Sequence, residues 1–522
     1  MLHDFRHAIR ALLRAPGFAA VVVATLALSI GATTTIYSVV RGVLLQPLPF
    51  ADPDRLVTLW QRAPGVGVDE DWFSIAQYAD IRDDTPALEH VAITWGQEVT
   101  LTADGTDPAR VGALQVSSSF FDVMGVDPRL GRRLRPEDDA PGAAQKALLG
   151  HEIFVQRFGA DPALVGSTIA LDGQLVEIVG VMPPLVLDAD VMPTLVTVPV
   201  FDLFLSFPLQ VVPTTRGSEN YNIIGKLDAS ATLAQLETEL LAIADGFTQD
   251  SLALAAGLTA GEDFWVGVVP LIEEVTGEIN APLVLLLAAT FVLLLIACAN
   301  VANLLLTRAT TKQRELSIRA SLGAPRQRMI RLAMLGSLLL SGAGGAIGVM
   351  IAITAVAALH AVAPSDLPRL SEIGVDPGVL LFAAGLCILS SVVFGVGPAI
   401  RTATADPGEV LREGSAAARA RSLWRNGASS ALVVLQVALS MLLVVGAGLL
   451  VRTFWQLQTV DPGFDADRAL SFRVALAGDR YGDPAARYDF YDQLFERTRG
   501  DHGWWGLAAA ADARPRLDRL RR

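Results

Sequence analysis

Long apolar runs alternate with polar segments along this 522-residue chain. A hydrocarbon core about 30 Å thick requires roughly 20 apolar residues in a helix. Five stretches of the chain reach that length, which predicts about five transmembrane helices. Their expected bounds are 18–45, 281–306, 332–362, 378–400 and 428–451.

The first apolar run follows three arginines, Arg6, Arg10 and Arg14, as the apolar region of a secretory signal peptide would. It is, however, longer than the roughly 7–15 residues of such a region, and no A-x-A cleavage site closes it. We therefore favour an uncleaved helix that begins the membrane domain.

The charges flanking these runs predict the orientation of the chain. The formal net charge of the chain is −13. Residues 1–17, 307–331 and 401–426 carry net charges of +2, +6 and +2, so the rest of the chain carries −23. Basic segments stay on the cytoplasmic side of a membrane. The pattern predicts a cytoplasmic N-terminus, with cytoplasmic segments 1–17, 307–331 and 401–427 and a short external loop at 363–377.

The interval 46–280 is too long for a simple connection and predicts a folded extracytoplasmic domain of mixed α/β type. Strand-like runs lie at 56–60, 98–105, 167–182 and 221–227. In the third, Asp172-Gly173 separates two alternating segments, which predicts a β-hairpin. The run 232–247 predicts a helix that buries one face, formed by Leu233, Leu236, Leu240 and Ile243.

Composition agrees with a membrane protein that carries a large water-exposed domain. Hydrophobic residues make up 52% of the chain, and the mean hydropathy is +0.44. The acidic balance argues against nucleic acid as the main partner. Cys298 and Cys387 both lie in apolar runs, so no disulfide framework is expected.

Motifs for catalysis or cofactor binding are absent from the sequence. Gly225-Lys226 lacks the upstream glycine and the following Ser or Thr of a phosphate-binding loop. His151-Glu152 lacks the second histidine of a zinc-protease motif. We expect no enzyme activity, no catalytic or metal-binding residues and no cofactor bound by this chain.

Two small-residue positions in the third span, Gly344 and Gly348, form a G-x-x-x-G pair that lets helices approach closely. They either pack within the bundle or contact a second membrane subunit.

The basic segment that follows the second span has helical spacing. Arg314, Ile318 and Leu322 lie four residues apart, as do Glu315 and Arg319. Gly323 suits the end of a helix, and Pro325 suits the first turn of the next. We predict an extension of the second span followed by a short surface helix, which is either a loop held by lipid phosphates or a docking helix for a cytoplasmic partner.

The chain also repeats itself. Residues 19–42 resemble 429–453, and DPDRL at 52–56 resembles DADRAL at 465–470. A second unit therefore begins near Trp424 and provides a fifth span and the start of a second external domain, 452–522.

These segments together resemble a known family. CANVANLLLTRATTKQRELSIRASLGAPRQRMIRL (298–332) resembles the second span and coupling segment of ABC transporter permeases of the MacB/FtsX-like superfamily. VSSSFFDVMGVDPRLGRRL (116–134), residues 158–184 and residues 223–240 resemble its periplasmic core domain. The opening residues resemble the duplicated-permease subfamily of acidobacteria (ADOP type), although this chain holds one full unit and a fragment of the second.

The resemblance implies a permease subunit in the bacterial inner membrane that works with a separate cytoplasmic ABC ATPase, which binds the ATP. It further implies a second permease unit, as a homodimer or pseudo-dimer, and leaves open a periplasmic adaptor or an outer-membrane channel. The expected role is export or efflux by mechanical transmission, and the residues that contact the ATPase would be Arg314, Glu315, Ile318, Arg319, Leu322, Gly323 and Ala324. The alternatives are an FtsX-like regulator of cell-wall hydrolases and a membrane-anchored binding module without an ATPase.

Overall fold

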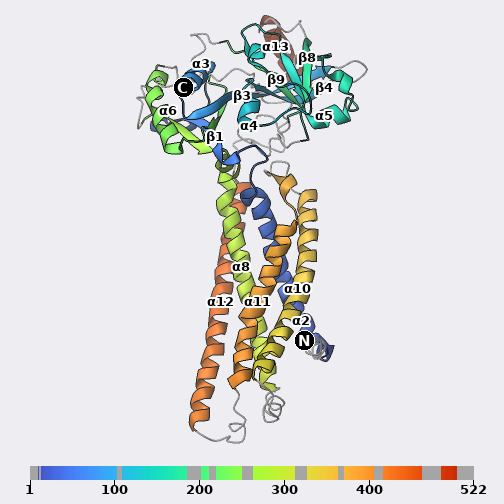
Figure 1. Ribbon diagram of the computed structural model, residues 1–522, viewed down its shortest axis with the longest axis vertical. Helices are drawn as coiled ribbons and strands as arrows, with labels where there is room; N and C mark the ends of the chain where they lie inside the picture. The colour runs from blue at the N-terminus through green and yellow to red at the C-terminus, as the bar shows by residue number, and fades with distance from the viewer. Residues whose placement is uncertain are drawn as a thin grey trace.

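The structure is a computed structural model that places a bundle of long helices beneath a mixed α/β domain (Figure 1). It describes residues 10, 13–102, 108–184, 201–210, 219–249, 263–311, 326–362, 369–404, 416–460 and 484–501. We call residues 46–270 the head domain.

Long helices form the bundle, and each is rich in apolar residues. They are α2 (Pro16–Val40), which continues into the π-helical turn η1 (Arg41–Leu45), α8 (Leu271–Thr311), α10 (Arg326–Val362), α11 (Pro377–Thr404) and α12 (Ala416–Gln458). Five stretches are long and apolar enough to cross a membrane: Pro16–Leu45, Ile279–Leu305, Met334–Val362, Pro377–Gly395 and Val433–Gln456. The prediction of five spans is confirmed.

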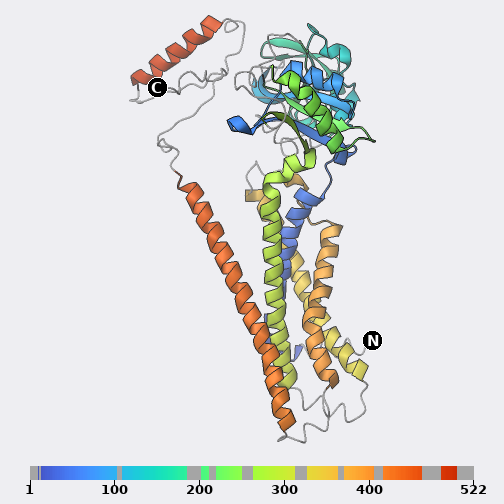
Figure 2. The ribbon, with the colours of Figure 1, turned by 90° about the vertical axis from the view of Figure 1, so that its left-hand side faces the viewer.

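The centre of the bundle is formed by α2, α8, α10 and α11. Their buried residues meet in one cluster that includes Leu26 and Ile30 of α2, Cys298 of α8, Leu340 of α10 and Phe394 of α11. Cys298 and Cys387 are free thiols. Helix α12 packs on α8. The two helices lie close at the end far from the head domain, and α12 moves away from the bundle along its length (Figure 2). None of the apolar window of α12 is buried.

The head domain contains one mixed sheet. Its strands are β1 (Leu56–Ala63), β2 (Val68–Asp71), β3 (Leu88–Thr102), β4 (Ala109–Val116), β5 (Leu130–Gly131), β6 (Lys146–Leu149), β7 (Thr168–Leu171), β8 (Gln174–Val181), β9 (Leu203–Ser206), β10 (Asn222–Leu227) and β11 (Trp265–Pro270). Their order is β11-β1-β10-β3-β4-β9-β6-β8-β5, with β2 on β1 and β7 against β3 and β8. The pairs β4–β9 and β6–β8 are parallel and the others antiparallel.

Short helices divide the head domain into regions with separate cores. One core includes α3 (Ile75–Asp84) and α6 (Leu233–Phe247), and a second lies under α5 (His151–Gln156). A third core includes α4 (Phe120–Met124), which lies on the side of the sheet that faces the bundle (Figure 1). The remaining described helix, α13 (Pro484–Asp501), lies apart from the head domain (Figure 2).

The head domain confirms the predicted β-hairpin. The hairpin expected at Asp172-Gly173 joins β7 to β8, with Leu171 opposite Gln174. Both turn residues have positive φ, 48° for Asp172 and 85° for Gly173, as a two-residue turn between twisted strands requires.

Other predictions need correction. Helix α6 buries Leu236, Leu240, Ala244 and Phe247, whereas Leu233 is 38% exposed because it is the first residue of the helix. Residues 98–102 of the strand expected at 98–105 form the end of the longer β3, and residues 103–105 lie outside the described residues. The linker expected at 401–427 is helical up to Thr404 and again from Ala416, since α11 and α12 extend beyond their apolar windows.

Candidate functional site

The predicted contact site for an ATPase falls outside the described residues. Helix α8 ends at Thr311 and α10 begins at Arg326, so all seven predicted residues, Arg314, Glu315, Ile318, Arg319, Leu322, Gly323 and Ala324, lie in the interval 312–325 between them. The structure describes the other end of the second span, where the bundle joins the head domain.

The two glycines of the third span lie against the first span. A Cβ added at Gly348 would be 3.0 Å from the carbonyl oxygen of Ala27 and from the amide nitrogen of Gly31. A Cβ at Gly344 would be 2.8 Å from the Cβ of Leu26. Such close approach of backbones is what small residues permit between spans. Both glycines therefore face α2 of the same chain.

The first span reaches the head domain through a break in its helix. The amide of Gln46 donates to the carbonyl of Arg41, five residues earlier, at 2.9 Å, and Gln46 itself is extended. The chain then continues as a short linker, in which Leu48 and Phe50 are buried in the same core as Phe120 and Phe121 of α4. The first span is thus fastened to the head domain by apolar residues of a linker.

The second span enters the head domain without a break. Strand β11 ends at Pro270 and α8 begins at Leu271, ten residues before the expected start of the span at 281, because the helix extends below the sheet. Leu271 is 1% exposed and belongs to the core that also holds Leu48 and Phe50. The indole nitrogen of Trp60 on β1 donates to the carboxylate of Glu274 at 3.0 Å.

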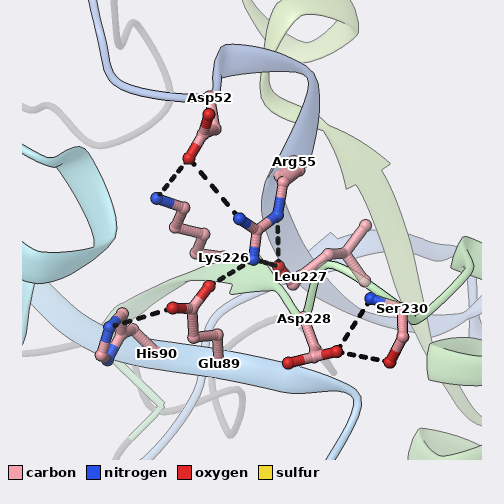
Figure 3. Close-up of polar contacts among 8 residues, drawn as sticks. All are labelled: Asp52, Arg55, Glu89, His90, Lys226, Leu227, Asp228 and Ser230. Carbon is pink, nitrogen blue, oxygen red and sulfur yellow. Dashed lines mark hydrogen bonds and ion pairs between the residues drawn. The ribbon is translucent and has the colours of Figure 1, made fainter.

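Charged side chains fasten the linker to the sheet just above this core (Figure 3). Arg55 of η2 (Pro53–Arg55) donates from Nε to the carbonyl of Leu227 at 2.8 Å and pairs with Glu89 on β3. Lys226 of β10 lies 3.0 Å from the carboxylate of Asp52. A hydrogen bond from this ammonium group lowers the pKa of Asp52. The network therefore joins the end of the linker to two neighbouring strands.

Two further residues extend the polar network at its edge. His90 lies 3.8 Å from the second oxygen of the Glu89 carboxylate. Asp228, directly after β10, accepts from the backbone nitrogen of Ser230 at 2.9 Å and from its hydroxyl at 2.6 Å, and these bonds lower the pKa of Asp228. Among the residues that the structure describes, no group of three His, Cys, Asp or Glu residues is arranged to hold a metal ion. The contacts described here join the linker of the first span to β3 and β10.

No pattern in the sequence assigns a role to these junction residues. DPDRL stands out in the sequence only as a repeated segment, and in the structure it provides Asp52 and Arg55. The signal that identifies them is position: charged residues directly after a span, at the entry to a folded domain. The related residues 465–470 lie outside the described residues.

Comparison with known proteins agrees with this architecture. Residues 19–243 match the family model of the MacB-like periplasmic core domain, and residues 287–407 match that of the FtsX-like permease C-terminal domain. The matches support membership of the MacB/FtsX-like permease superfamily. The chain is thus similar to these permease families in two separate segments, and its long apolar helices are those of a multi-pass membrane protein.

Curated relatives match parts of this chain. The macrolide export ATP-binding/permease protein MacB of Wolinella succinogenes is 26% identical over 52% of this chain and 39% of the relative. The ABC transporter permease YknZ of Bacillus subtilis is 35% identical over 23% of this chain and 28% of the relative. The chain spans less than half of the length of these relatives.

Solved domains of such proteins also match. The periplasmic region of MacB from Actinobacillus actinomycetemcomitans is 15% identical, with a TM-score of 0.30, over 45% of this chain and 94% of that one. The extracellular domain of YknZ from Gram-positive bacteria is 14% identical, with a TM-score of 0.27, over 41% of this chain and 99% of that one.

Proposed function

We propose that this chain is the permease subunit of an ABC transporter of the bacterial inner membrane, driven by a separate ATPase. Residues Arg314 to Ala324 would receive the motion of the ATPase on the cytoplasmic side. The second span would then carry the motion to an extracytoplasmic head domain that acts on an exported substrate. The duplicated (ADOP-type) subfamily remains our assignment for the opening residues and the repeat.

The observation that carries this proposal is the continuity of α8. The helix contains 41 residues and is about 60 Å long at 1.5 Å per residue. It begins in the core of the head domain at Leu271 and ends at Thr311, three residues before the predicted coupling residue Arg314. Pro282 removes one hydrogen bond of this helix, and the helix continues on both sides of it.

The test is recovery of an ABC ATPase with the full chain. The double variant Ile318→Asp, Arg319→Glu places charge in the predicted apolar contact and reverses a second charge, so we expect at least a tenfold lower recovery of the ATPase. The control variant Arg452→Glu also reverses a charge, at an exposed position near the end of α12, and should leave recovery unchanged.

Equal recovery with the double variant and with the wild type would contradict the proposal. A reporter fused near Thr311 should also be cytoplasmic and one fused after Asp107 extracytoplasmic, and the reverse result would overturn the orientation.

A further inference from the structure

A fully buried arginine lies at the outer end of the first span. Arg369 is 0% exposed and precedes the short turn η8 (Leu370–Glu372) between α10 and α11. Its guanidinium donates to the carbonyls of Val43 at 2.9 Å, Gln46 at 2.7 Å and Pro47 at 3.1 Å, and also to the carboxylate of Glu372. One side chain therefore binds a segment more than 300 positions away in sequence.

These carbonyls need such a donor because of where they lie. The last carbonyls of a helix have no partner within the helix, and η1 is followed at once by extended backbone. A positive charge at the C-terminal end of a helix also interacts favourably with the helix dipole. The planar guanidinium presents several N–H groups in a fixed arrangement. Arg369 thus caps the first span from a different part of the chain.

Further contacts reinforce this cap. Arg41 Nε lies 2.8 Å from the carboxylate of Asp376, which precedes α11. A Cβ added at Gly42 would be 2.9 Å from the carbonyl oxygen of Glu372, so η8 lies directly on the π-helical turn. Val43 and Ile373 are buried in one apolar cluster beneath these bonds.

We propose that Arg369 is a positioning residue that fixes the outer end of α2 to the connection between α10 and α11. The anchoring by Arg369 does not depend on the proposed function.

The anchor is tested in the full chain without any ATPase. In a Cys298→Ala, Cys387→Ala background in lipid nanodiscs, spin labels are placed at Leu45 and Leu380, which are 59% and 46% exposed. Electron–electron double resonance then measures their distance distribution. We expect a narrow distribution that becomes about twofold wider in Arg369→Gln. Arg369→Lys keeps the charge without the fork and should give an intermediate width.

One control and one further variant separate anchoring from general loss of structure. Arg62→Gln removes an arginine that pairs with Glu70 in the head domain and should leave the width unchanged. Gly42→Ala displaces η8 without changing Arg369 and should widen the distribution, which keeps the test decisive if Arg369→Gln does not fold. An unchanged width in a folded Arg369→Gln protein would overturn the anchor, as would an unchanged width in Gly42→Ala.

Discussion

The first and second spans join the same head domain in different ways. The helix of the first span ends in a π-helical turn at Leu45, and a linker carries the chain into the sheet. The helix of the second span starts directly after the last residue of β11, and its first residue, Leu271, is part of the core. One connection contains a break in regular structure and the other does not.

This difference assigns different mechanical properties to the two connections. An α-helix is stiff because each turn is bonded to the next. Helix α8 has this regularity from the sheet to Thr311 apart from Pro282, which has no N–H to donate within the helix. The linker of the first span lacks such a series of turns. It is held by Phe50 in the core, by Arg55 on β10 and β3, and by a bond from the Ala51 amide to the carbonyl of Met124. Both connections end in one core, and the head domain is thus supported at two neighbouring points.

The largest expected effect comes from breaking α8 between the sheet and the membrane. Gly277 lies in this interval, and a Cβ added there meets nothing within 4 Å. Gly277→Pro removes a helix hydrogen bond and adds a clash, at a cost of about 3 kcal/mol. Hydrogen-exchange mass spectrometry should show protection of the surrounding amides lowered by about 100-fold.

The matched control is Gly277→Ala at the same position. Alanine favours the helix by about 1 kcal/mol over glycine, so protection should rise by roughly fivefold. If proline and alanine gave the same protection, α8 would not be the continuous element that distinguishes the two connections.

A smaller effect is expected where the first span packs against the third. Gly348→Val places side-chain atoms against the backbone of Ala27 and Gly31. Overpacking of this kind costs about 1–3 kcal/mol, and the melting temperature of the protein in detergent should fall by several degrees. Gly342→Val, on the same helix with open space around it, should change the melting temperature little. Equal losses in both variants would show that the first span is not tightly held.

Much of the fold follows from patterns that are local in sequence. Apolar length identifies the five spans, and Asp172-Gly173 identifies a hairpin because few residues adopt positive φ readily. The buried face of α6 was predicted to begin at Leu233, which is wrong. Leu233 shares the apolar spacing, but the sheet covers the face that runs from Leu236 to Phe247. The packing partner decides which part of an apolar face is buried, and spacing alone does not contain that information.

The junction could not be predicted in the same way because its contacts join distant positions. Arg369 reads in sequence as one charge in a loop, and only the fold brings it to the carbonyls of Val43 and Gln46. The helical extension of the second span toward the sheet could not be predicted for a related reason. Residues 271–280 include Glu273 and Glu274, so they do not extend the apolar run, yet they are helical below the sheet.

The smallest expected effect concerns the charge of Asp52, which helps to hold the linker of the first span. Lys226 lowers the pKa of this carboxylate in the folded state, so the pair adds stability above the unfolded pKa of about 3.9 and loses it as the pH falls through the folded value. Asp52→Asn should therefore lower the melting temperature at pH 7 by about 1 °C, since exposed pairs contribute little. The difference from the wild type should vanish as the pH falls below the lowered pKa of Asp52 in the folded state. Asparagine also adopts the φ of 52° at this position, so the substitution leaves the backbone unchanged. A difference that persists at low pH would therefore mean that Asp52 does not act through its charge.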